Sequence, residues 1–76
     1  MTREKSILNE LNTVESRIKN ALLAGDMEKY SKWDNYQRGQ LKMLYMMGYK
    51  AVEDPQKAQQ INDFWVNYYT NIIDMR

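Results

Sequence analysis

Residues 26–52, DMEKYSKWDNYQRGQLKMLYMMGYKAV, form a long stretch without proline that ends in a nearly unbroken apolar run. Its length and residue types predict a central helix over about residues 27–53. The last half of that helix is apolar on almost all sides, and a helix of this kind is normally buried. Gly48 lies in this run, which predicts that another helix approaches closely there. One neighbouring helix cannot cover such a surface, so further partners are required.

The segment before the central helix carries an apolar stripe with helical spacing. The stripe recurs every three or four residues and consists of Ile7, Leu11, Val14, Ile18 and Ala21. This pattern predicts a helix over about residues 3–24. Gly25 follows as the expected left-handed residue after the helix, and Asp26 follows as the N-cap of the central helix. A joint this short predicts an antiparallel helical hairpin.

The segment after the central helix begins at Asp54-Pro55, a pair that typically ends one helix and starts the next. Apolar and aromatic residues then recur at helical spacing at Ala58, Ile61, Trp65, Tyr68, Ile72 and Met75. This pattern predicts a third helix over about residues 55–74. We therefore predict an all-α fold, a single domain over residues 1–76 in which the antiparallel helical hairpin and the third helix form a small bundle.

The composition argues against most catalytic and metal chemistry. The chain has no Cys and no His, so it lacks disulfides, thiolate ligands and the commonest general base. We expect no metal, no cofactor and no enzymatic activity. The net charge of +1 disfavours duplex DNA as a partner. The chain has no membrane-spanning apolar run and no signal core, so we expect a soluble, cytoplasmic protein with no membrane partner.

A chain of 76 residues usually needs disulfides, a metal or oligomerisation to be stable. Without Cys and His, oligomerisation remains. The predicted second and third helices carry more apolar surface than one contact covers, which predicts a homo-oligomer. The candidate interface residues are Leu41, Leu44, Met47, Gly48, Trp65, Tyr68, Tyr69, Ile72 and Ile73.

Cations and phenols share one face of the predicted central helix. The candidate ligand-binding residues are Arg38, Lys42, Tyr45, Tyr49 and the nearby Lys50. Two cations beside two aromatic rings can hold a phosphate and stack on a base. The alternative is that Asp34 pairs with Arg38 and that both tyrosines belong to the core or to an interface. A second mixed surface lies upstream, at Lys29, Lys32, Trp33 and Tyr36.

One pattern consists of Trp33, Arg38, Leu41, Tyr45-Met46, Lys50-Ala51-Val52 and Pro55. It resembles the small helical-hairpin phage proteins that counter CBASS immunity by sequestering cyclic oligonucleotide signals. The resemblance covers only the stretch from Trp33 to Pro55. It implies a non-catalytic sponge, an oligomer that holds a cyclic nucleotide between protomers. Arg38 and Lys50 would then bind phosphate, and Tyr45 would stack on a base.

The leading hypothesis is a small non-enzymatic binding or assembly protein that acts as a homo-oligomer or on a protein partner. Small helical proteins of this kind are common among phage accessory proteins, which is an analogy and not a derivation. One alternative is a phage anti-defence protein that sequesters cyclic di- or trinucleotides between protomers. Another alternative is binding of single-stranded nucleic acid.

Overall fold

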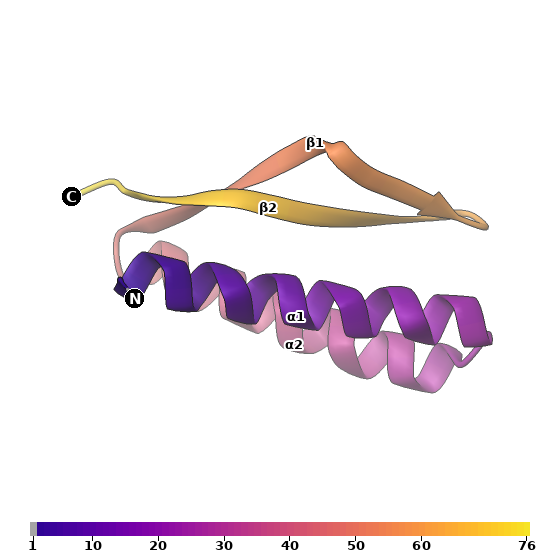
Figure 1. Cartoon of the computed structure of the whole chain (residues 1–76). Coiled ribbons are helices and arrows are strands. Elements are labelled where there is room, and N and C mark those ends of the chain that lie inside the picture. The colour runs from indigo at the N-terminus through magenta and orange to yellow at the C-terminus, as the bar shows by residue number, and fades with distance from the viewer. Residues whose placement is uncertain (1) are drawn as a thin grey trace.

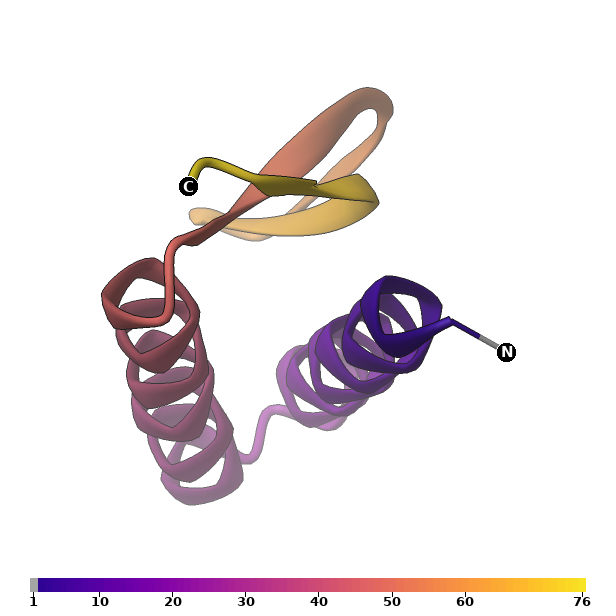
Figure 2. The same ribbon diagram turned by 90° about the vertical axis from the view of Figure 1, so that its left-hand side faces the viewer.

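The computed structural model describes residues 2–76 and consists of two helices followed by a β-hairpin (Figure 1). The helices are α1 (Arg3–Ala24) and α2 (Met27–Met46), and the strands are β1 (Tyr49–Ile61) and β2 (Phe64–Asp74). The helices lie side by side, and the hairpin covers one side of both (Figure 2). The fold is therefore α+β, and the predicted all-α fold with a third helix is wrong.

The two helices are joined as the local sequence predicts. The Thr2 side chain caps α1 by accepting a hydrogen bond from the Lys5 backbone N–H at 3.2 Å. Gly25 follows α1 in the left-handed conformation, with φ of 69°. Asp26 caps α2 by accepting from the Lys29 backbone N–H at 3.1 Å. These caps satisfy backbone groups that a helix end leaves without partners, so the joint is set by short-range chemistry.

The second helix ends earlier than the sequence predicts. α2 stops at Met46, and Gly48 has a φ of 88°, a backbone conformation that takes the chain out of the helix. The Gly48 carbonyl then accepts a hydrogen bond from the Met75 backbone N–H at 2.7 Å, which ties this turn to the end of β2. Gly48 is thus a turn residue, and the predicted close approach of another helix is wrong. Its close neighbour is the side chain of Arg76.

Replacing Gly48 by alanine should lower the free energy of unfolding by about 1–2 kcal/mol. The positive φ strains any residue that has a Cβ, and that Cβ would collide with the Arg76 side chain. Denaturant unfolding gives the measurement. The matched control is Gly39→Ala inside α2, where a Cβ would meet nothing within 4 Å. That substitution should stabilise the protein by up to about 1 kcal/mol, so a gain at both positions would refute the turn at Gly48.

A two-residue turn, Asn62-Asp63, joins the long strands, and Asn62 adopts a φ of 56°. Asparagine tolerates this left-handed conformation better than most residues. The segment after the turn is rich in β-branched and aromatic residues, which favour strands, whereas β1 contains only Tyr49, Val52 and Ile61 of these types. Residues 64–74 alone contain FWVNYYTNIID. Their composition therefore agrees with a strand, although their spacing indicates a helix.

The helical spacing in β2 coincides with irregular strand pairing. The buried residues Val66, Tyr69 and Ile72 are three apart, whereas a regular strand buries every second residue. Each of these two intervals contains one shift in the β1–β2 register. One shift places an extra residue, Thr70, in β2 and reverses the face to which the next residues of β2 point, whereas the other shift places three extra residues in β1. Both spacings of three in β2, which suggest a helix, thus fall where the strand pairing is irregular.

Asp54-Pro55 forms a bend within β1 and does not begin a helix. The Asp54 carboxylate accepts a hydrogen bond from the Gln56 backbone N–H at 3.1 Å, a local turn. The register jumps from Asp54 to Gln59, so Pro55 lies in a part of β1 without a paired residue on β2. Proline has no N–H to donate to the ladder and is tolerated at such sites. Figure 1 shows β1 bending sharply near its middle.

The core lies between α1, α2 and the hairpin and consists of two clusters. Toward the N-terminus of α1, Leu11 packs with Leu44, Tyr49, Tyr69 and Ile72. Toward its C-terminus, the cluster consists of Val14, Ile18, Leu22 and Val66. α1 contributes to both clusters and contacts both α2 and β2. The element around which the core is built is therefore α1, and the predicted role of residues 27–53 as the central helix is wrong.

Candidate functional site

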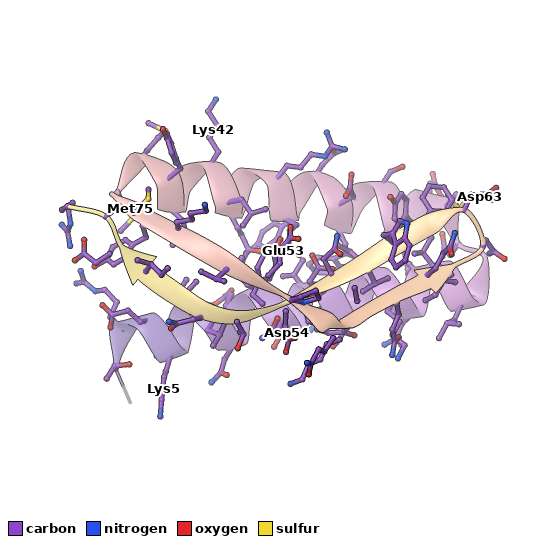
Figure 3. All side chains as sticks on the ribbon, turned by 90° about the horizontal axis from the view of Figure 1, so that it is seen from above. Lys5, Lys42, Glu53, Asp54, Asp63 and Met75 are labelled. Carbon is purple, nitrogen blue, oxygen red and sulfur yellow. The ribbon has the colours of Figure 1, made fainter. Side chains whose placement is uncertain are left out.

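The structure separates the five predicted ligand-binding residues. Arg38, Lys42 and Tyr45 lie on α2, whereas Tyr49 and Lys50 lie on β1, because the helix ends at Met46. Arg38 makes an exposed ion pair with Asp34, with 3.1 Å between Nε and the carboxylate oxygen. Lys42 projects away from the hairpin at the edge of the helical layer (Figure 3). The shared helical face on which the prediction rested is absent, and the ligand itself stays a prediction.

Tyr49 belongs to the core and cannot stack on a base in this structure. Its residue surface is almost fully buried, and its ring lies 5.0 Å from the Arg76 guanidinium. Arg76 also donates a hydrogen bond to the Tyr49 hydroxyl at 3.0 Å. Tyr45, by contrast, is 72% exposed. The two phenols are therefore in different environments, one structural and one open to solvent.

The predicted interface residues divide into buried and exposed groups. Leu44, Tyr69 and Ile72 are buried inside the chain, while Leu41 packs against the same cluster. Tyr68 is partly buried and packs against the second cluster. The exposed members are Met47, Trp65 and Ile73. Hence much of the apolar surface that seemed surplus in the sequence is covered by the chain's own hairpin.

An open groove runs between α1 and α2. Its first part has a volume of about 530 Å³ and is mostly apolar, with Ile7 and Leu11 on one wall and Tyr36, Met43 and Leu44 on the other. None of its lining residues comes from the hairpin, which lies on the other side of both helices (Figure 2). We call this hollow and its continuation the interhelical groove. It shows that the hairpin leaves one side of the helical layer uncovered.

The groove continues toward the joint between the helices and becomes cationic and aromatic. Glu10 and Tyr36 line both the apolar part and the next part, and Arg17 and Trp33 line the remaining length. The Arg17 guanidinium lies 5.0 Å from the centroid of the Trp33 ring. Lys32 approaches the same ring at 5.4 Å, and Tyr36 meets it edge-on at 5.7 Å. The upstream basic–aromatic surface is therefore brought together, and Arg17 is a member that the sequence did not suggest.

Two polar residues of α1 lie against the hairpin. The Asn12 side-chain amide donates to the Tyr69 carbonyl at 3.0 Å and accepts from the Tyr69 N–H at 2.9 Å. Tyr69 is paired with Glu53 of β1, and Asn12 satisfies its backbone N–H and carbonyl on the edge of β2 that has no neighbouring strand. One turn further along α1, Glu15 is buried. The sequence contained a signal for this burial, because Glu15 lies seven residues after Leu8 and seven before Leu22. This spacing places its carboxylate on an apolar face of the helix.

The pKa of Glu15 is raised from 4.5 to about 7, mainly by burial. A hydrogen bond with the Asn67 backbone opposes this shift, and the negative charges of Asp34 and Glu53 add to it. The folded state therefore holds a proton at Glu15 that the unfolded state releases between pH 4.5 and 7. Stability from this group is complete below pH 4.5 and is lost as the pH rises through about 7.

We expect the free energy of unfolding to fall by about 2 kcal/mol between pH 5 and pH 7 through Glu15. Glu15→Gln is neutral at every pH and should remove this slope. Denaturant titrations at several pH values provide the measurement. The exposed Glu10→Gln on the same helix is the control and should keep the wild-type slope. An unchanged slope in Glu15→Gln would show that this carboxyl does not titrate in the window.

No family model matches this chain, and no curated protein or solved structure is significantly similar to it. Neither helix of residues 2–76 is long and apolar enough to cross a membrane. Function must therefore be inferred from the arrangement of the residues. The feature that stands out is the interhelical groove, because it combines exposed apolar and charged side chains on the uncovered side of the helices.

Proposed function

We propose that this chain is a small non-enzymatic assembly protein that acts as a homo-oligomer in the cytoplasm. The observation that supports this proposal is the uncovered side of the helical layer. There, Tyr36 is 49% exposed and Met43 is 61% exposed, and both line the interhelical groove. Aromatic residues and methionine are enriched at protein interfaces, and methionine adapts its shape to a partner.

The apolar side chains that the core leaves exposed support the same proposal. The hairpin buries one side of the helices, yet many large apolar side chains of residues 2–76 remain at least 44% exposed. They are Leu23, Met27, Tyr36, Met43, Tyr45, Met46, Met47, Trp65, Ile73 and Met75. Single exposed apolar residues are ordinary, but two of these, Tyr36 and Met43, line the mostly apolar part of the interhelical groove, and an apolar groove is typical of an interaction site. A short chain also gains stability when a second copy covers such a surface.

The alternative, a sponge for cyclic nucleotides, has less support from the geometry. Its candidate residues lie on two different elements, and Tyr49 is buried within the chain. Arg38 is already paired with Asp34 at the surface. A nucleotide site would therefore need residues from more than one copy. Assembly is the requirement that both functions share, so it is the step to test first.

Light scattering over a range of protein concentrations should give a mass above the 9.1 kDa of one chain. Met43→Glu places a charge in the interhelical groove and should weaken association by at least about tenfold. Leu23→Glu is the matched control, because Leu23 is 64% exposed but does not line the groove. A mass of 9.1 kDa for the wild type at all concentrations would overturn the proposal.

A further inference from the structure

We propose that two copies pack through the helical sides opposite their hairpins, with each helix antiparallel to its own counterpart, and that Glu10 of one copy meets Arg17 of the other. This inference rests on the proposed homo-oligomer and adds its interface, its symmetry and its stoichiometry. The resulting dimer would have two central layers of helices and one hairpin on each outer side. A two-fold axis makes every such contact occur twice.

The charges of α1 support this symmetry. Glu10 and Arg17 are seven residues apart, so they lie on one helical face about 10.5 Å apart along the axis. Both line the interhelical groove, and neither makes an ion pair within residues 2–76. Arg17 is held against Trp33, which orients its guanidinium in the groove. Two opposite charges without ion-pair partners on one exposed face are what a self-complementary contact needs.

The position of these charges defines where the axis crosses. The midpoint between Glu10 and Arg17 falls between Thr13 and Val14, which is also the midpoint of α1 (Arg3–Ala24). An antiparallel second copy of α1 that crosses there places each Glu10 against an Arg17. If the two-fold axis instead ran along the helices, α1 of one copy would lie over α2 of the other copy. Glu10 would then not meet Arg17.

The second helix satisfies the same geometry. The midpoint of α2 (Met27–Met46) lies next to Tyr36. Tyr36 and Thr13 line the same part of the interhelical groove, so the midpoints of both helices are at the same level. The axis that pairs Glu10 with Arg17 therefore also brings the two half-exposed Tyr36 rings together. A pair of aromatic rings at the centre of the contact is typical of interface hot spots.

The available area is close to that of a stable dimer. α1 has 22 residues and is about 33 Å long at about 1.5 Å per residue. Two packed helices form a face roughly 18–20 Å wide. The flat area of this face is thus on the order of 600 Å², and the side chains that project from it add further surface. A standard interface buries roughly 800 Å² per partner, so the available area is close to it.

A single engineered cysteine tests the axis, because the chain has no cysteine of its own. Helices packed about 8–10 Å apart bring Cα atoms that face each other to within roughly 3.5–5.5 Å, which overlaps the range of disulfides. Thr13→Cys should therefore form a disulfide-linked dimer under mild oxidation. Ser16→Cys is the control, because Ser16 is exposed on α1 but lines a hollow with residues of the hairpin. Equal cross-linking at both positions would overturn the proposed axis.

A charge swap tests the pairing. Glu10→Arg and Arg17→Glu should each raise the dimer dissociation constant on the order of tenfold, because each puts like charges into both symmetric contacts. The double variant, Glu10→Arg with Arg17→Glu, restores opposite charges and should recover most of the wild-type affinity. If Arg17 acted only within its own chain, through Trp33, the double variant would be as weak as the worse single variant. That result would overturn the pairing.

The outcomes separate this inference from the proposed function. A wild-type chain that is monomeric at every concentration contradicts both. A chain that self-associates, but whose Thr13→Cys variant cross-links no better than Ser16→Cys and whose charge swap gives no rescue, contradicts only the proposed interface. Circular dichroism melts of each variant confirm that the compared proteins are folded. Selective cross-linking at position 13 together with rescue by the swap supports the interface.

Discussion

Replacing Leu11 by alanine should destabilise the protein by about 3–4 kcal/mol and lower its melting temperature by at least about 12 °C. Leu11 is only 1% exposed and packs at once against α2, the start of β1 and the end of β2. Truncation removes apolar contacts and leaves a cavity that three elements border, so no single element can move to fill it. A loss of this size is a large part of the stability of a small domain.

The control for Leu11→Ala is Leu23→Ala on the same helix. Leu23 is 64% exposed, so its truncation changes the unfolding free energy by at most about 0.5 kcal/mol. Both substitutions replace leucine by alanine within α1, so they remove the same atoms and change helix propensity equally. The difference between them therefore measures burial alone. Equal losses at the two positions would mean that the hairpin does not cover α1 as described.

Asn12→Ala should cost about 2–4 kcal/mol, although it removes only a polar side chain on a helix. The substitution leaves both the N–H and the carbonyl of Tyr69 without their partner at a partly buried position. Each unsatisfied backbone group costs about 1–3 kcal/mol. Hydrogen exchange should also become faster around Tyr69, since Asn12 holds the strand where its pairing with β1 is irregular. Chemical denaturation and exchange rates together provide the measurement.

Two further variants sharpen the test at Asn12. Asn12→Asp keeps the acceptor for the Tyr69 N–H but loses the donor for its carbonyl, so it should lose less stability than alanine. Asn20→Ala, at an exposed position of the same helix, should instead gain up to about 0.5 kcal/mol because alanine favours helix. A gain at both asparagines would show that Asn12 does not hold the hairpin.

The residues of the interhelical groove could be predicted from the sequence only in part. The sequence predicted one basic–aromatic surface on α2, because its residues are close together along one helix. They are Lys29, Lys32, Trp33 and Tyr36. Arg17 joins them only because the α1–α2 joint brings another helix alongside. The predicted face of Arg38, Lys42, Tyr45, Tyr49 and Lys50 failed because its continuity depended on a helix beyond Met46. A pattern on one helix holds only as far as that helix extends.

The sequence by itself determined α1, the joint at Gly25-Asp26 and the start of α2. Each of these depends on residues within about one or two helical turns, through capping, left-handed glycine and apolar spacing. It also determined which catalytic and metal chemistries lack residues, because that follows from composition alone. These features need no knowledge of what packs against them, so they can be derived before any tertiary contact is known.

Only the tertiary structure decided that residues 49–74 form a β-hairpin and not a third helix. The spacing of three in β2 falls at two shifts in strand register, and a register exists only once two strands are paired. The contacts that hold them in place, from Asn12 to Tyr69, join residues 57 apart in the sequence. Strand propensity depends on such packing more than helix propensity does, so the local pattern could not choose correctly between a third helix and a hairpin. The burial of Glu15 follows from the same packing, since its pKa rises only when the hairpin covers α1.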